Sequence, residues 1–431
     1  MPALCIHAAP RHAAWICSAP GATVYAWSSP APRCYVRSVE LRPSAADYAF
    51  DAAAFDALRS RFEQGYLSVD IARLPRPPDT LDSLPNPPVH DFRTFGPRVA
   101  EGERNLGYLA ERGRFALRNG RAAVLILNGG MATRFGGVPK GVVPVVEGQP
   151  ETFLWVKLAQ VAKLIRELDA TIPVIVMHSF ATEAVSRKHL QDIDWAGVPE
   201  AMRCEFSQSI MPRVTPNAVP LANLPGADAL PDTVVYAAPG HGDTLIRLRA
   251  SGVLHKLRQA GVEHMLVSNV DNLGAELDPI LLGGHIEAVD AGAHMSVEVV
   301  RRENDKGGCV GVIAGRPVII EGFRLPEGTD YDRYPQFNTN TLWFWLSAID
   351  RDFDLDWFPV EKQVEGPDGK PIEVVQFEQL IGQATEHLEA HYFEVDRERR
   401  FLPIKTWDDL AAAMPRMRAM VKRLRAAAEA E

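Results

Sequence analysis

The sequence predicts an α/β fold built on a three-layer, largely parallel mixed sheet. Short apolar runs, of which Ala122–Leu127 is the clearest, are typical of strands buried on both faces of a sheet. Helical patterns separate these runs, and the strongest spans 152–168, where Leu154, Leu158 and Val161 recur at steps of four and three. Strands that alternate with helices indicate a parallel sheet covered by helices on both faces.

The first 120 residues are predicted to lie outside this sheet. Residues 1–43 contain no Asp or Glu before Glu40, and their scattered prolines oppose an amphipathic helix. We interpret them as a disordered tail, or as the product of a start codon assigned too far upstream, in preference to a transit peptide. Residues 44–120 are expected to be a helical and Pro-rich segment. It would hold a helix from Ser44 to about Tyr66, an extended stretch with seven prolines over 74–97, and a short helix with Gly120 as its C-cap.

Residues 121–395 are predicted to form the main domain, and 396–431 a C-terminal segment. Further strands are expected over Val174–Met177 and Val262–Val267, with a helix around Thr244–Ala260 leading into the second of them. The C-terminal segment contains a helix beyond Trp407 whose apolar residues fall on one face: Leu410, Met414, Met417, Val421 and Leu424.

Composition excludes several classes of protein. The chain has 431 residues, enough for two or three domains, and its 46% hydrophobic and 23% charged residues are ordinary for a soluble globular protein. A net charge of −9 argues against nucleic-acid binding, and no apolar run is long enough to predict a membrane span. The cysteines are scattered without metal-binding spacing, as expected of free thiols in the cytoplasm: Cys5, Cys17, Cys34, Cys204 and Cys309.

The stretch Asn128–Lys140 is the most informative in the chain. It follows an apolar strand, contains four glycines, and carries the cations Arg134 and Lys140. Glycines allow backbone N–H groups to approach an anion closely. The loop matches neither a Walker A loop nor a dinucleotide-binding loop. A simple turn leading to a second strand over Val142–Val146 is the alternative, but the Thr-Arg pair and the Pro-Lys ending favour a polyphosphate site.

Three further polar clusters follow predicted strands or flank predicted helices. They are Pro239–Asp243, Ser268–Gly274 and Phe337–Thr341, and in the last of these Asn338 and Asn340 would point to one side of an extended strand. Each cluster alone is typical of a turn. Together they predict a site for hydroxyl groups and a metal-bound phosphate. Because ligands bind at the carboxyl ends of parallel strands, residues 129–140 and 268–274 are expected to face one crevice.

The chain resembles the UTP–glucose-1-phosphate uridylyltransferase family from about residue 122 to residue 410. The motifs that carry the resemblance occur in the family's order: Asn128–Lys140, Phe206–Ser209, Pro239–Asp243, Ser268–Gly274, Lys306–Gly308, Glu321, Phe337–Asn340 and Arg400–Lys405. The resemblance implies a Rossmann-like fold of the nucleotide-diphospho-sugar transferase type. It also implies that 121–395 is the catalytic domain and that 396–431 carries a catalytic lysine.

The same resemblance implies a role for each matched residue. Nucleotide binding would involve Asn128, Gly129, Gly130, Gln208, Gly240 and His241. Sugar binding would involve Asn269, Glu321, Asn338 and Asn340. The catalytic cations would be Lys140, Lys405, Arg134 and Lys306. Asp271 would bind Mg²⁺, which prefers a carboxylate together with phosphate oxygens.

The implied partners are UTP and glucose-1-phosphate, and the implied products are UDP-glucose and pyrophosphate. A sugar phosphate has a second pKa of about 6, so its oxygen is already anionic at neutral pH and needs no general base. We therefore expect a Mg²⁺-dependent in-line attack without a covalent intermediate.

Three departures from the family's pattern leave the identity of the sugar open. They are Ala132 in place of a usual glycine, Thr133–Arg134 as in UDP-N-acetylglucosamine pyrophosphorylases, and Gly141 in place of a usual serine. Glucose is the first choice, and N-acetylglucosamine or galactose is the alternative. An NAD-dependent dehydrogenase and a catalytically silent nucleotide-sugar binder are the alternatives from other classes.

Overall fold

The structure is a computed structural model that describes residues 41–67, 90–91, 106–132, 135, 137–303, 305, 307–325, 327–366 and 369–429. Almost all of the tail predicted for 1–43 lies outside these residues, and so does almost all of the Pro-rich stretch 74–97. The predicted site residues Arg134 and Lys306 also lie outside them.

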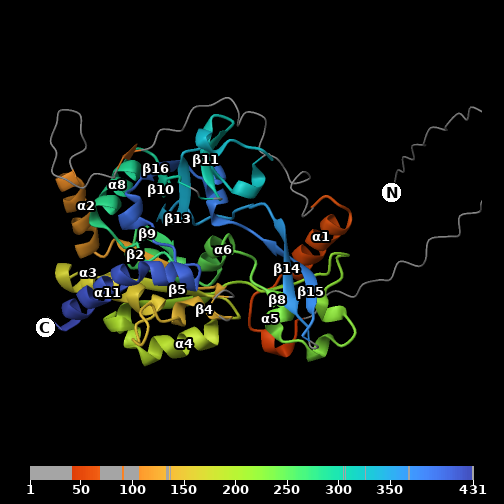
Figure 1. Ribbon diagram of the computed structural model, residues 1–431. Coiled ribbons are helices and arrows are strands. Elements are labelled where there is room, and N and C mark those ends of the chain that lie inside the picture. Colours follow the sequence, from red (N-terminus) through yellow and green to blue (C-terminus); the bar gives the residue numbers. More distant parts are fainter. Residues whose placement is uncertain are drawn as a thin grey trace, which may run out of the picture. The chain divides into compact units, whose positions relative to one another are not determined.

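A ten-stranded mixed sheet lies at the centre of the described chain (Figure 1). Its spatial order is β1 (His90–Asp91), β16 (Ala390–Glu394), β10 (Met295–Arg301), β13 (Gln336–Trp345), β9 (His264–Asn269), β2 (Ala122–Leu127), β5 (Val174–His178) and β6 (Arg203–Ser207). The hairpin of β11 (Cys309–Ile313) and β12 (Arg316–Ile320) joins it at β13. Strand β13 runs antiparallel to its neighbours β10 and β9, whereas β9, β2, β5 and β6 are parallel. The predicted largely parallel mixed sheet is confirmed.

Helices cover both faces of this sheet. In β2, Val124 and Ile126 belong to the apolar core on one face, and Leu125 and Leu127 to the core on the other. The first core also contains residues of α2 (Leu106–Arg118), α3 (Phe153–Leu168), α4 (Glu183–Asp192), α8 (Pro279–Asp290) and α11 (Trp407–Glu429). The second contains residues of α6 (Asp243–Ala250), α7 (Val253–Gln259) and α9 (Ala384–His387). This alternation confirms the three layers.

Three predicted elements differ from the structure. The first helix is α1 (Ala52–Glu63), and it begins at residue 52 because the Asp51 carboxylate accepts the backbone N–H of Ala54. The helix predicted over 244–260 is divided into α6 and α7 at Gly252, whose φ of +79° breaks the helix. The strand considered for Val142–Val146 is absent, because a 3₁₀ turn over Lys140–Val142 leads directly into a loop.

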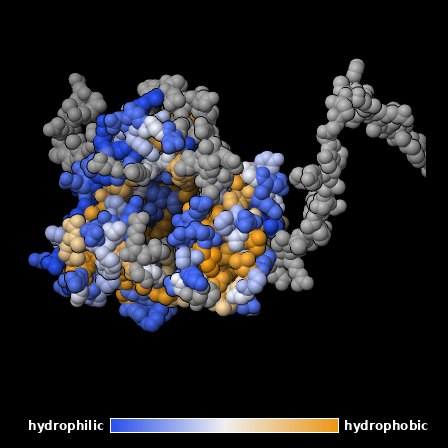
Figure 2. Space-filling view, turned by 45° about the vertical axis from the view of Figure 1, so that its right-hand side comes forward, coloured by the Kyte–Doolittle hydropathy of each residue, from blue (hydrophilic) through white to orange (hydrophobic). Residues whose placement is uncertain are grey.

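A second group of elements adjoins the sheet. It consists of α1 and of elements that were not predicted: the hairpin β14 (Phe358–Glu365)–β15 (Pro371–Glu378), the short strands β7 (Met211–Pro212) and β8 (Tyr236–Ala237), and α5 (Asp232–Val235). Phe55 and Phe62 of α1 pack edge-on against Phe377 of β15, which places α1 beside the hairpin (Figure 1). On the face seen in Figure 2, hydrophobic residues gather on the part that holds this hairpin, and mainly hydrophilic residues surround the hollow beside it.

Candidate active site

Two loops at the carboxyl edge of the sheet meet through one ion pair. The first follows β2 and spans residues 128–140 (the β2 loop), and the second follows β9 and spans residues 270–278 (the β9 loop). Lys140 Nζ lies 2.7 Å from Asp271 Oδ2, and the two side chains are 12% and 19% exposed. This contact places the two loops side by side at one edge of the sheet. Lys140 also lies over the rings of Phe135 and Phe153, which limit its movement.

Asn128 anchors the start of the β2 loop. Its backbone N–H donates to Met177 O at 2.9 Å, and its amide Nδ2 donates to Ser186 Oγ of α4 at 2.9 Å. The side chain is fully buried, so it would influence a nucleotide by shaping the loop rather than by touching it. A Cβ at Gly141 would lie 2.2 Å from Asn128 Oδ1, so packing accounts for the glycine at this position.

Three predicted nucleotide-binding residues converge beside this anchor. Gln208 Nε2 donates to Gly240 O at 2.7 Å, and its backbone N–H donates to His178 O. A Cβ at Gly129 would lie 2.2 Å from Gln208 Oε1, so only glycine fits there. Gly130 has open space around its Cα in the described structure. The structure thus brings together residues that lie on three separate loops of the sequence.

The Pro239–Asp243 turn is shaped by the end of the β15 hairpin. A Cβ at Gly240 would lie 2.4 Å from Gln379 O, and the Gly242 N–H donates to the same oxygen at 2.8 Å. Between these glycines, His241 Nδ1 accepts the backbone N–H of Ile381 at 3.0 Å. Burial lowers the pKa of His241 to about 4, so the ring is neutral at pH 7 and its proton lies on Nε2. His241 therefore offers a hydrogen-bond donor at Nε2.

Asp243 connects this turn to Gln208. Its buried carboxylate accepts both the backbone N–H of Ser209 at 2.7 Å and the Ser209 hydroxyl at 3.0 Å. Burial raises the pKa of Asp243 to about 6. Because Ser209 follows Gln208 directly, this carboxylate fixes the position of the Gln208 amide.

Three of the four predicted sugar-binding residues are linked by hydrogen bonds, and the fourth, Glu321, lies near them. Asn340 Nδ2 donates to Asn269 Oδ1 at 3.0 Å, and the Asn340 backbone N–H donates to Asn338 Oδ1 at 3.0 Å. A Cβ at Gly308 would lie 3.2 Å from Glu321 Oε2 and 3.4 Å from Asn338 Cβ, which places Glu321 beside Asn338. Burial raises the pKa of Glu321.

Asn338 and Asn340 were expected to point to one side of an extended strand, but the backbone is not extended here. Strand β13 shifts register against β10 at this point, and Asn340 has a φ of +55°. The bulge places the Asn340 amide against Asn269 of the neighbouring strand instead. Bulges of this kind redirect a side chain next to a functional site.

Lys405 lies next to the β9 loop. The backbone N–H of Ile404 donates to Asp271 O at 3.1 Å, and Leu402 N–H donates to the side chain of Asn272 at 2.9 Å. The Lys405 side chain is exposed, and among the described residues its ammonium has no hydrogen-bond or ion-pair partner. Lys405 is thus free to contact a bound phosphate.

Two buried cations beneath the site were not predicted. Lys157 of α3 is 2% exposed, and its Nζ donates to Ser268 Oγ at 2.8 Å and to Ala275 O at 2.5 Å. Burial lowers its pKa to about 7. Arg400 binds Glu298 of β10 with two hydrogen bonds, at 2.7 and 3.0 Å. A signal for Lys157 exists in the sequence, since it falls three residues after Leu154 within the apolar stripe of its helix.

In the described part of the chain, no group of three or more His, Cys, Asp or Glu side chains could hold a metal ion. Asp271 is a single, partly exposed carboxylate. One carboxylate is what Mg²⁺ takes from a protein when substrate phosphates and water complete its shell, so Asp271 fits that ion. None of the helices that the structure describes is long and apolar enough to cross a membrane.

The chain is similar in sequence to known enzymes. The UTP–glucose-1-phosphate uridylyltransferase of Saccharomyces cerevisiae is 35% identical over 303 residues, which cover 67% of this chain and 58% of the yeast protein. The Hordeum vulgare enzyme of the same name is 32% identical over 305 residues, covering 67% of this chain and 61% of the barley protein. The chain thus spans about three fifths of the length of these relatives.

Solved structures with the same fold include the UDP-glucose pyrophosphorylase of Leishmania major. It is 25% identical with a TM-score of 0.63, and the match covers 84% of this chain and 74% of that one. The UDP-N-acetylglucosamine pyrophosphorylase of Trypanosoma brucei has a TM-score of 0.66 over 86% of this chain and 78% of its own, at 20% identity, which supports the fold alone. The family model for UTP–glucose-1-phosphate uridylyltransferase matches residues 106–425, and the chain belongs to that family.

Proposed function

We propose that the chain transfers the uridylyl group of UTP to glucose-1-phosphate and releases pyrophosphate. The single observation that carries the proposal is the contact between Lys140 and Asp271, which joins a glycine-rich phosphate loop to a loop that bears a metal-type carboxylate. Family membership and the names of the relatives support the same reaction. A cytoplasmic location is part of the proposal, in keeping with the free thiols of Cys204 and Cys309.

The nucleotide would bind between the β2 loop and the Pro239–Asp243 turn. An amide can match the donors and acceptors of uracil, and Gln208 presents its amide beside Gly240 at this place. The backbone of Gly129 and Gly130 would hold the phosphates, together with Lys140. The Nε2–H of His241 would donate to an oxygen between nucleotide and sugar phosphate.

The sugar would bind along Asn269, Asn340, Asn338 and Glu321. Amide groups donate and accept hydrogen bonds and a carboxylate accepts them, so these side chains suit hydroxyl groups. Hydrogen bonds link the three asparagines, and Glu321 and Asn338 both lie next to Gly308. Asn269 lies two residues before Asp271. The sugar phosphate would therefore lie beside Asp271 and Lys405.

Catalysis would consist of positioning and charge stabilisation. The sugar phosphate oxygen is anionic at neutral pH, so it attacks the α-phosphorus of UTP without a base while pyrophosphate leaves in line. Repulsion between the two anions opposes this approach. Lys140, which pairs with Asp271, and Lys405, which adjoins the β9 loop, would offset the repulsion, and Arg134 and Lys306 are further candidates. Bound at Asp271, Mg²⁺ would supply additional positive charge to the phosphate oxygens.

A direct test of the proposal is the formation of UDP-glucose. The protein is incubated with UTP, glucose-1-phosphate and MgCl₂, and both UDP-glucose and pyrophosphate are quantified by chromatography. Equal amounts of the two products, and their loss when EDTA is added, are expected. Tight UTP binding without either product would mean that the chain is a silent binder.

A further inference from the structure

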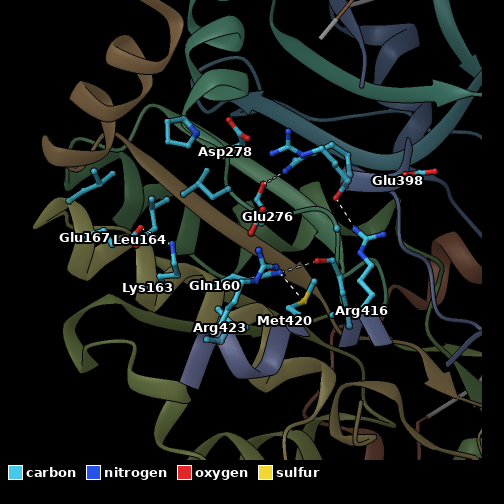
Figure 3. A pocket seen from close by; sticks show the side chains of 18 of the residues that line it. Gln160, Lys163, Leu164, Glu167, Glu276, Asp278, Glu398, Arg416, Met420 and Arg423 are labelled. Atoms are coloured by element: carbon cyan, nitrogen blue, oxygen red, sulfur yellow. Dashed lines mark hydrogen bonds and ion pairs between the residues drawn. The ribbon is translucent and has the colours of Figure 1, made fainter. Parts of the chain in front are cut away.

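The β9 loop carries Asp271 of the candidate active site and also lines a cavity. This cavity measures about 710 Å³ and is lined by the β9 loop together with residues of α3, α10 (Arg397–Arg400) and α11 (Figure 3). Gln160, Glu276 and Asp278 are seen around this cavity in Figure 3. Leu273 is buried and anchors the loop by its side chain, but the loop forms neither helix nor strand.

The β9 loop has no helix or strand, and side chains donate hydrogen bonds to its backbone carbonyl groups. Lys157 Nζ donates to Ala275 O at 2.5 Å and, more weakly, to Asn272 O at 3.4 Å. Gln160, one turn further along α3, donates to Leu273 O at 2.9 Å, and Arg400 donates to Glu276 O at 2.8 Å. Four of the five carbonyl groups between residues 272 and 276 are thus bound by side chains, and Lys157 binds two of them.

Lys157 is an unfavourable residue for its location. Its ammonium is buried, and no carboxylate among the described residues contacts it. An apolar side chain of the same length would suit the surrounding stripe of α3 at a lower cost in desolvation. An ammonium has three N–H donors, and here they meet three oxygens, those of Ser268, Asn272 and Ala275. Its contacts, rather than its burial, account for the lysine.

The contacts of Lys157 lie on both sides of Asp271 in the sequence. Ser268 is three residues before Asp271, and Asn272 follows it directly. The side chain of Asn272 in turn accepts the Leu402 N–H at the start of the segment that carries Lys405. A shift of the β9 loop would therefore move Asp271 and Lys405 together.

We infer that Lys157 is a positioning residue of the active site, which fixes the β9 loop so that Asp271 and Lys405 reach the phosphates. This inference rests on the proposed function. Partners in the second layer of a metal site typically change metal affinity or activity by about 10–100-fold when they are removed. We expect the removal of the Lys157 ammonium to change activity and Mg²⁺ affinity by a factor in that range.

The test compares Lys157→Met with Lys163→Met. Lys163 lies on the same helix, but it is 39% exposed and pairs with Glu167 at the surface. For Lys157→Met we expect kcat to fall by about 10–100-fold and the Mg²⁺ concentration for half-maximal activity to rise. The KM for UTP should change less than about threefold, because Gln208 and Gly240 lie on other loops. Lys163→Met should behave as wild type, and a wild-type kcat and Mg²⁺ requirement in Lys157→Met would overturn the inference.

Two additional measurements distinguish loss of the positioning role from misfolding of the variant and from failure of the proposed function. Ser268→Ala removes one of the three acceptors and should produce a smaller shift of the Mg²⁺ requirement in the same direction. Hydrogen exchange does not depend on activity, and Lys157→Met should speed exchange in peptides that cover 268–278 but not in those that cover 203–209. A wild type that forms no UDP-glucose would overturn the proposed function alone, whereas unchanged exchange at 268–278 would overturn the positioning role.

Discussion

Lys140 Nζ lies 2.7 Å from Asp271 Oδ2, although 131 residues separate the two in the chain. The pair brings the β2 loop and the β9 loop together at the carboxyl edge of the sheet. The Ile404 N–H donates to the backbone oxygen of Asp271, which holds the neighbouring Lys405 beside the β9 loop. Three distant segments of the chain thus adjoin where we propose that the phosphates react.

Lys405→Ala should lower turnover far more than it lowers UTP affinity. The Lys405 side chain is exposed and its ammonium has no partner among the described residues, so truncation to alanine should leave the fold intact. We expect kcat to fall by at least about 100-fold, the range seen when one stabilising donor is removed, and the Kd for UTP to change by a few fold. Steady-state kinetics and calorimetry measure the two quantities. Lys422→Ala, at an exposed position of α11, is the control, and equal turnover in both variants would remove Lys405 from catalysis.

Gly129→Ala should weaken UTP binding strongly. The added methyl group would lie 2.2 Å from Gln208 Oε1 and would displace that amide. We expect the Kd for UTP to rise by about tenfold or more, which corresponds to about 1.4 kcal/mol. Fluorescence titration with UTP measures the affinity, with Lys422→Ala at an exposed position of α11 as the control. Equal affinities in Gly129→Ala and the control would exclude Gln208 from nucleotide binding.

The UTP affinity of the wild type should decline relative to that of Asp243→Asn as the pH falls below 6. Asp243 has a pKa raised to about 6 by burial, and its ionised form accepts both hydrogen bonds from Ser209. Protonation weakens this hold on Gln208. The ratio of the two affinities cancels the titration of UTP itself, and a ratio that is constant from pH 5 to 7.5 would contradict the role of Asp243.

The raised pKa of Asp243 predicts the opposite pH dependence for the free energy of unfolding. The pKa of Asp243 is higher in the folded than in the unfolded state, so its contribution to stability is fully present below about pH 4 and is lost as the pH rises through 6. Unfolding by urea at several pH values should therefore show the wild type losing stability relative to Asp243→Asn over this range.

Arg400→Met should destabilise the fold by about 3–5 kcal/mol, because it leaves Glu298 as an unpaired buried charge. The Glu298 carboxylate would keep only the hydrogen bond from Trp343 Nε1. The exposed pair Lys188–Asp192 offers a control, and Lys188→Met should cost less than about 1 kcal/mol. Urea unfolding of both variants measures the difference. Equal losses would mean that the buried pair contributes no more than a surface pair.

Local patterns in the sequence were sufficient for much of the fold. The apolar run Ala122–Leu127 and the stripe of α3 match the observed β2 and α3. Burial on both faces leaves a continuous apolar run, and burial on one face of a helix leaves a periodic stripe. The hairpin β14–β15 was missed, since its packing depends on α1, about 300 residues earlier in the sequence. The break at Gly252 was missed because a single glycine is compatible with a continuous helix.

The candidate site was predicted as a set of residues, not as a geometry. The bulge at Asn340 arises from pairing with β10 and cannot be inferred from the alternation of asparagines. Lys157 and Arg400 were missed because their partners, Ala275 and Glu298, lie more than 100 residues away in sequence. Buried polar contacts of this kind leave no periodic pattern.

The central claim is tested most directly by measuring pyrophosphate release from UTP and Mg²⁺ with a panel of sugar phosphates. The panel contains the 1-phosphates of glucose, galactose and N-acetylglucosamine, and TTP replaces UTP in a control. We expect kcat/KM to be highest with glucose-1-phosphate and UTP, and release to vanish without Mg²⁺. Faster release with N-acetylglucosamine-1-phosphate, or no release with any sugar despite tight UTP binding, would contradict the proposed function.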